Sequence, residues 1–156
     1  MKEVVIISPF TGNVIPIEDV PDPVFAEKML GDGIAVNPSD GKVLAPLDGT
    51  ITILHSSGHA FTVQATDSPA VTVLVHVGLD TVKLKGQGFT LHAKVGDVVK
   101  VGQQVISIDL KTINDAGYSP LSPVILPDLP EEAQVEKYEL SRVVAGSTAL
   151  LKVSLP

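Results

Sequence analysis

The sequence predicts an all-β protein, an antiparallel β-sandwich or barrel with an internal pseudo-repeat and one or two short helices. Three observations support this class. Apolar residues occur in short runs and mostly alternate with period two. Glycine-containing turns separate these runs, and 13 glycines and 12 prolines disfavour long helices. The length of 156 residues suits one domain, residues 1–156, which is large enough to bury a core.

The expected strands follow directly from the alternation. Turn pairs such as Asp32-Gly33 and Asp48-Gly49 stand between them. Many short strands with such turns are typical of sandwiches and barrels. The predicted strands are residues 4–7, 13–17, 33–37, 50–54, 59–65, 71–77, 98–108 and 149–155.

Two short helices are expected, at residues 23–30 and 110–116. For the first, Asp22 is a suitable N-cap and Gly31 a suitable C-terminal cap, while proline is favoured at the first helical position. Gly117 would close the second. The proline-rich stretch that follows predicts extended loop around one strand, residues 124–126.

A weak internal repeat supports the pseudo-symmetry. The sequence PFTGNV at residues 9–14 is echoed by PLDGTI at residues 46–51, and each places a glycine turn before a strand. A related rhythm, VGDVVKVGQ, occupies residues 95–103 and is typical of strands that bend around glycines.

Composition excludes several function classes. Without cysteine there are no disulfides, thiolate metal sites or thiol nucleophiles, and nothing requires an oxidising compartment, which favours a cytoplasmic location. The net charge of −7 has the wrong sign for neutralising nucleic-acid phosphates or binding an anionic membrane. Signal-peptide, membrane-span, phosphate-loop and dinucleotide-binding patterns are all missing, so we expect neither membrane insertion nor common nucleotide chemistry.

The histidines are the remaining candidates for chemistry. Alternation in residues 71–77 places the valines on one face and His76 on the other, although a lone strand histidine is more often structural. His59 follows the Ser-Ser-Gly turn, and an antiparallel hairpin between the two runs would bring it beside His76. Such a pair, with Ser57 and Asp80 close by in sequence, suits either a metal ion or a phosphoryl group. The other two histidines are expected to face solvent; they are His55 and His92.

Six separated motifs then point to one family. They are FAEKMLGDG at residues 25–33, APLDGT at 45–50, HAF at 59–61, HVGLDTV at 76–82, KGQGF at 85–89 and SPV at 122–124. In content and order they resemble the glucose-type IIA domain of the bacterial phosphoenolpyruvate-dependent sugar phosphotransferase system. The resemblance spans nearly the whole chain and implies an antiparallel β-sandwich.

The resemblance also implies an activity. The domain is a phosphotransferase with a phosphohistidine intermediate and no cofactor. It takes a phosphoryl group from the histidine-containing phosphocarrier protein and passes it to a cysteine of a IIB domain during sugar uptake. His76 matches the phosphoryl acceptor, through Nε2, and His59 the residue that stabilises the phosphoryl group. Ser57 stands where a threonine hydroxyl is usual, and the Gly78 carbonyl would hold Nδ1 of His76.

A docking surface is implied as well. Asp22 and Asp80 match acidic residues that meet arginine of the phosphocarrier protein. The apolar docking positions are Val24, Phe25, Met29, Leu30, Leu74 and Val82. Helical spacing alone would instead assign several of these to a core. The chain departs from the family where aromatic residues are usual, at His55 and Leu74, and where an aliphatic one is usual, at Pro23.

Other readings stay open at this stage. The unphosphorylated face could regulate metabolic enzymes or transporters, with a zinc ion bridged by His59 and His76 in such a complex. A zinc peptidase of related β fold would use His76 and Asp80 as a ligand pair, but no histidine follows His92 to complete its motif. A biotin- or lipoyl-carrier domain would need a lysine hairpin between methionines, which is missing. We expect a monomer that binds no nucleic acid.

Overall fold

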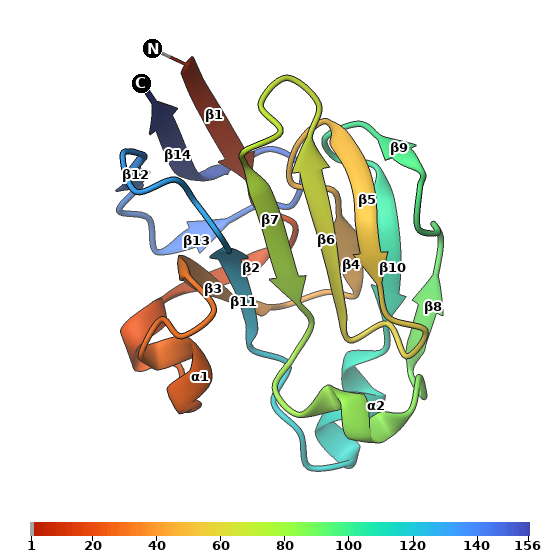
Figure 1. Ribbon diagram of the computed structural model, residues 1–156. Helices are drawn as coiled ribbons and strands as arrows, with labels where there is room; N and C mark the ends of the chain where they lie inside the picture. Colours follow the sequence, from red (N-terminus) through yellow and green to blue (C-terminus); the bar gives the residue numbers. More distant parts are fainter. Residues whose placement is uncertain (1) are drawn as a thin grey trace.

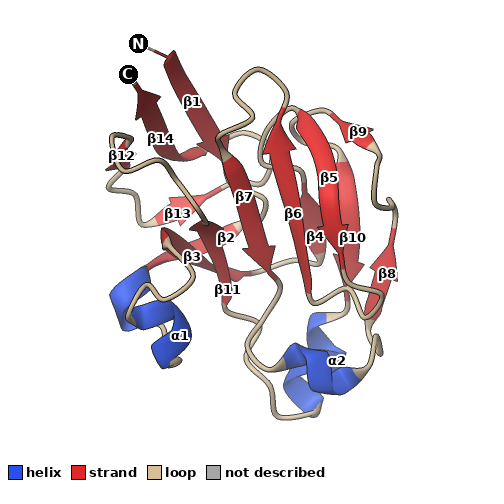
Figure 2. Ribbon diagram, viewed as in Figure 1, coloured by secondary structure: helices blue, strands red, loops and turns tan. Residues whose placement is uncertain are grey.

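Three antiparallel sheets pack as a sandwich in the computed structural model, which describes residues 2–156. The helical segments gather at one end of the molecule, whereas the two chain ends lie at the other (Figures 1 and 2). The predicted fold class is therefore confirmed.

The largest sheet has eight strands. In spatial order they are β13 (Arg142–Val143), β2 (Gly12–Pro16), β3 (Asp32–Pro38), β11 (Ser122–Leu126), β7 (Thr72–His76), β6 (Ala60–Ala65), β5 (Gly49–Leu54) and β9 (Val98–Val99). One three-stranded sheet contains β1 (Lys2–Ile7), β14 (Ala149–Leu155) and β12 (Gln134–Lys137). The other contains β4 (Lys42–Leu44), β10 (Gln104–Ile108) and β8 (Phe89–Leu91). The helices are α1 (Pro23–Ala26) and α2 (Leu110–Asp115), with the 3-10 turns η1 (Ile17–Asp19) and η2 (Thr81–Leu84).

The main core draws side chains from all three sheets. Phe61 of β6, Ile106 of β10 and Val153 of β14 are each fully buried in it. Alternation in β7 works as predicted, since Val73 and Val75 enter this core while the intervening side chains point to the other face.

A smaller apolar cluster lies on that other face. It contains Ile17, Val20, Phe25, Ala35, Leu79 and Ile125, with Leu74 packed against it. The cluster anchors η1 and α1 to the sheet beside the end of β7. The outward-facing end of β7 therefore borders packed apolar side chains.

Two predicted elements differ from the structure. Residues 98–108 form two strands in different sheets, because Gly102 adopts a left-handed conformation and Gln103 donates to the Lys100 carbonyl in a turn. The first helix ends at Ala26, well before Gly31, because Lys28 takes a left-handed conformation with φ of 58°. The lysine amine then bridges Glu18 and Asp32.

The remaining helical predictions agree better. Asp22 caps α1 by accepting from the Val24 amide at 3.0 Å. The second helix, α2, ends one residue early, and Gly117 follows in a left-handed conformation. Within residues 2–156, no helix is both long and apolar enough to span a membrane.

The internal repeat has a steric reason. Gly12 and Gly49 begin β2 and β5, and a carbonyl oxygen of the neighbouring strand lies where each would carry a Cβ atom. These carbonyls are those of Asn37, 1.9 Å from the Cβ position at Gly12, and Gln64, 2.2 Å from that at Gly49. Only glycine permits this close strand approach.

Candidate functional site

The last residue of β7 and the turn before β6 bring two histidines together, and this end of β7 points toward the end of the molecule where the helical segments gather (Figure 1). His76 ends β7 and pairs with Ala60 at the start of β6. The Val77 amide donates to the His59 carbonyl at 2.7 Å, which extends the ladder by one step. The ring centroids of His59 and His76 lie 5.7 Å apart, at an interplanar angle of 67°. The predicted hairpin juxtaposition is confirmed.

The ring of His76 has a defined tautomer. Its Nδ1 lies 2.7 Å from the carbonyl oxygen of Gly78. A carbonyl can only accept, so Nδ1–H is the donor, and in the neutral ring the lone pair remains on Nε2. Phe25 packs edge-on against the same ring, with centroids 5.1 Å apart. Orientation and reactive nitrogen are thus both specified.

The peptide around Gly78 is itself anchored. Its N–H donates to Ser122 Oγ at 3.0 Å, and the Ser122 hydroxyl donates to the Pro120 carbonyl at 2.7 Å. The Leu79 amide donates to the Ser119 carbonyl at 3.0 Å. Gly78 has φ of 78°, a left-handed conformation that glycine adopts without strain. Sequence reasoning noted SPV only as a motif and missed this supporting role of Ser122.

His59 is restrained by side chains. Ser57 Oγ and His59 Nδ1 are hydrogen bonded at 2.5 Å. His55 stacks on the His59 ring, with centroids 4.5 Å apart and an interplanar angle of 23°. Sequence reasoning expected His55 and His92 to face solvent, and both are exposed. It missed the stacking of His55, although two histidines flanking a tight hairpin turn were a usable signal.

Both paired histidines favour the neutral form. Burial, reinforced by the neighbouring His55 and His76, lowers the pKa of His59 to about 4. Burial also lowers the pKa of His76, against the opposing effects of the Gly78 hydrogen bond and the Asp22 carboxylate. A neutral His76 keeps its Nε2 lone pair available at neutral pH.

The predicted docking residues divide into two groups. Val24, Met29, Leu30 and Val82 are exposed, Met29 most of all at 69%. Phe25 is only 4% exposed, because its ring packs in the smaller cluster and against His76, and its place on a contact surface stays a prediction. Leu74 is half-buried on the same cluster.

The predicted acidic pair lies on the two segments that border His76. Asp22 caps α1, and Asp80 is exposed just before η2. Each carboxylate favours the protonated form of His76 and so opposes the lowering of its pKa by burial.

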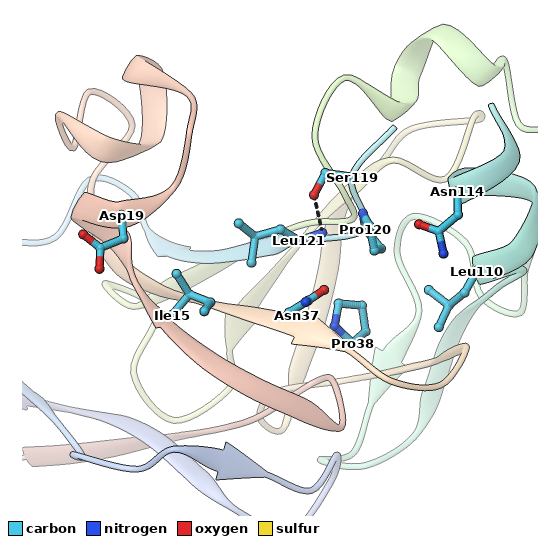
Figure 3. A pocket seen from close by; sticks show the side chains of 9 residues that line it. All are labelled: Ile15, Asp19, Asn37, Pro38, Leu110, Asn114, Ser119, Pro120 and Leu121. Atoms are coloured by element: carbon cyan, nitrogen blue, oxygen red, sulfur yellow. Dashed lines mark hydrogen bonds between the residues drawn. The ribbon is translucent and has the colours of Figure 1, made fainter. Parts of the chain in front are cut away.

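A separate hollow lies beside Ser119 and Pro120, whose carbonyls help to anchor the peptide around Gly78. It has a volume of about 530 Å³ and is lined by Ile15, Asp19, Asn37, Pro38, Leu110, Asn114, Ser119, Pro120 and Leu121. Figure 3 shows Ser119, Pro120 and Leu121 along one side, and the Ser119 hydroxyl accepting from the Leu121 amide. No histidine lines this hollow. The histidine pair therefore lies at the open end of the β6–β7 hairpin, outside this hollow.

Metal ligation was one open reading of the histidine pair. Among residues 2–156, no three His, Asp or Glu side chains are grouped closely enough to hold a metal ion. A zinc ion on His59 and His76 would therefore need further ligands from another molecule. The prediction of a bridged zinc in a complex stays a prediction.

An antiparallel sandwich that presents a free imidazole Nε2 beside a second neutral imidazole suits a β-sandwich phosphocarrier domain. Residues 4–131 match the family model described as phosphoenolpyruvate-dependent sugar phosphotransferase system, EIIA 1. The chain belongs to this family, as its motifs indicate.

Relatives cover almost the whole chain. It is 42% identical over 152 residues to the PTS system glucose-specific EIIA component of Oceanobacillus iheyensis, covering 97% of this chain and 91% of the relative. The corresponding protein of Buchnera aphidicola is 41% identical over 150 residues, covering 96% and 91%. Glucose permease IIA from Mycoplasma capricolum has a similar structure, with a TM-score of 0.87, 31% identity, and 97% and 96% coverage.

These findings agree on the general activity. The chain is a phosphocarrier component of sugar uptake, and its partners are other components of the phosphotransferase system. Nothing in them supports a zinc peptidase, a biotin- or lipoyl-carrier domain or a regulatory module.

Proposed function

We propose that this chain accepts a phosphoryl group on Nε2 of His76 from the histidine-containing phosphocarrier protein and passes it to a cysteine of a IIB domain. One observation carries the proposal. The hydrogen bond of His76 Nδ1 to the Gly78 carbonyl leaves Nε2 as the only nucleophilic nitrogen of the acceptor ring.

The accepting step needs no cofactor. The Nε2 lone pair attacks the phosphorus atom, an N–P bond forms on His76, and the N–P bond on the donor's histidine breaks, returning an electron pair to that ring. Positive charge develops on the attacking ring. The Gly78 carbonyl, which accepts the Nδ1 hydrogen, stabilises that charge, and so do the carboxylates of Asp22 and Asp80.

His59 stabilises the phosphoryl group. If the Ser57 hydroxyl donates to Nδ1, the neutral ring carries its hydrogen on Nε2. That N–H can donate to a phosphoryl oxygen on His76, because the two rings are 5.7 Å apart between centroids. A preorganised donor of this kind strengthens as charge builds up on the phosphoryl oxygens.

The onward step ends on sulfur. A cysteine thiolate attacks phosphorus, a P–S bond forms, and the N–P bond on His76 breaks to restore the neutral ring. The chain has no cysteine, so the acceptor lies outside these 156 residues.

Exposed apolar side chains beside the site form the proposed docking face. They are Val24, Met29, Leu30 and Val82, with half-buried Leu74. Asp22 and Asp80 flank the acceptor and suit arginine side chains of a basic partner. The net charge of −7 adds long-range attraction. We further propose that residues 1–156 form one domain and act in the cytoplasm, where these partners would meet it.

Phosphoryl acceptance by mass spectrometry tests the proposal. After incubation with the phosphorylated carrier protein, the wild-type chain should gain one phosphoryl group and His76→Ala should gain none. His92→Ala is the matched control, because His92 is exposed and bonded to Ser107 of β10, in another sheet, and it should be labelled like wild type. Labelling of the His76→Ala protein would show that another residue is the acceptor.

A further inference from the structure

His55 is a third imidazole at the site. It follows the end of β5 and stacks on the ring of His59. It is exposed, yet its ring lies 4.5 Å from that of His59, at 23° to it. Backbone bonds hold the two together, since the His55 amide donates to the Ala60 carbonyl at 3.1 Å and the Gly58 amide to the His55 carbonyl at 2.8 Å. The tight turn therefore presents both rings side by side.

His59 is consequently restrained in two independent ways. Ser57 holds its Nδ1 through a hydrogen bond of 2.5 Å, which limits rotation of the ring within the ring plane. His55 covers a face of the ring, which limits tilting. The His59 ring meets the His76 ring edge-on, at an interplanar angle of 67°, and neither restraint covers this side. A ring held in this manner points its Nε2 edge in one direction without further ordering during the reaction.

We propose that His55 is a positioning residue, which by stacking holds the His59 ring in the orientation that supports the phosphoryl group on His76. This inference rests on the proposed function, because it concerns the transfer step in which His59 acts. His55 works through His59 and itself touches no reacting atom. Stacking requires a flat ring at position 55 and does not require a nitrogen.

The strength of such a contact sets the expected effect. Offset stacking of two rings contributes about 0.5–1.5 kcal/mol, which corresponds to roughly threefold to tenfold in a rate. Removing the ring should therefore slow the transfer measurably without abolishing it. The substitution lies on an exposed turn, so the fold should tolerate it.

Three variants separate stacking from other roles. His55→Ala removes the ring, His55→Phe keeps a flat ring without nitrogens, and His92→Ala removes an exposed histidine elsewhere. We expect His55→Ala to be phosphorylated by the carrier protein and then to pass the group to the IIB cysteine about threefold to tenfold more slowly in kcat. His55→Phe should recover the wild-type kcat, and His92→Ala should match wild type.

A second readout is independent of phosphoryl transfer. In NMR spectra of the unphosphorylated proteins, nuclear Overhauser effects between the His59 and His76 rings should be equally strong in wild type and His55→Phe. They should weaken in His55→Ala, because the His59 ring can then tilt although Ser57 still holds its Nδ1. Wild-type transfer by His55→Ala together with unchanged nuclear Overhauser effects would overturn the inference, as would a failure of His55→Phe to restore kcat. Failure of wild type to accept phosphate would overturn the proposed function and leave the NMR comparison to decide the stacking.

Discussion

The two histidines of the site are held by different parts of the chain. His76 ends a strand between buried valines, and a backbone carbonyl binds its Nδ1. His59 follows an exposed turn, and two side chains, Ser57 and His55, restrain it. A backbone restraint survives most substitutions of its own residue, whereas a side-chain restraint is lost with a single one. The proposed acceptor, His76, is thus held by a restraint that tolerates substitution, whereas the proposed supporting ring, His59, is held by one that a single substitution removes.

This difference fits the two proposed roles. An acceptor must present the same nitrogen to every partner, which a fixed tautomer on a buried strand ensures. A supporting donor must suit the phosphoryl group as it arrives and leaves, and its orientation can be tuned by neighbouring side chains. Substitutions at the supporting side should therefore separate acceptance from onward transfer.

The largest such separation is expected from His59→Gln. His76 should still accept the phosphoryl group, because its own nitrogen and tautomer are unchanged. Transfer to the IIB cysteine should fall by about 10²–10³-fold, the usual cost of removing a preorganised donor to a charged transition state. Rapid-quench measurement of each step checks this, with His92→Gln as control. Onward transfer at the normal rate would remove His59 from the mechanism.

Gly78→Ala probes the backbone restraint on His76. A Cβ atom there would lie 2.5 Å from Thr81 Cγ2 and 3.0 Å from the Ser119 carbonyl oxygen, and φ of 78° disfavours any side chain. The carbonyl that holds His76 Nδ1 must then move, so we expect acceptance itself to slow, by about 100-fold for a displacement near 1 Å.

Gly96→Ala is the matched control for that substitution. Gly96 has φ of 94°, but nothing lies within 4 Å of its Cβ position. In both variants the left-handed backbone should lower the free energy of unfolding by about 1–2 kcal/mol, measurable by urea unfolding. Only Gly78→Ala should also be phosphorylated more slowly. Equal rates in the two variants would show that the Gly78 carbonyl is not what sets the reactivity of His76.

The smallest effect concerns pH. Burial and two neighbouring imidazoles lower the pKa of His59 to about 4, whereas an unfolded histidine titrates near 6.5. Below about pH 6.5 the unfolded chain binds a proton that the folded chain does not, so stability falls as the pH drops from about 6.5 toward 4. NMR titration should find His59 neutral above pH 5.5, and His59→Gln should flatten this part of the stability profile. A His59 pKa near 6.5 would contradict the account.

Much of the fold follows from local pattern. The alternation of residues 71–77 predicted which side chains of β7 enter the core. Val73 and Val75 point inward, whereas Leu74 and His76 lie on the other face. Strands β4, β8, β12 and β13 escaped prediction. They are short, and they form because they pair with β10, β14 or β2 and not because of any periodicity of their own.

The site was predictable where its parts are consecutive. A hairpin joins His59 and His76, so their proximity could be read from the sequence. The bond from Gly78 to Ser122 joins residues 44 positions apart, and only the completed sheet brings them together. Phe25 was ambiguous because helical spacing suits both a core and a docking face, and the cluster that buries it includes Leu79 and Ile125, which only the completed sheet brings beside it.

The central claim is that Nε2 of His76, and no other nitrogen, carries the phosphoryl group. Phosphorus–nitrogen coupling in NMR spectra of the phosphorylated, ¹⁵N-histidine-labelled protein tests this most directly. The account predicts one phosphohistidine, His76, with phosphorus coupled directly to Nε2 and with Nδ1 still protonated against the Gly78 carbonyl. Phosphorus bound to Nδ1, or to His59 or His55, would contradict it.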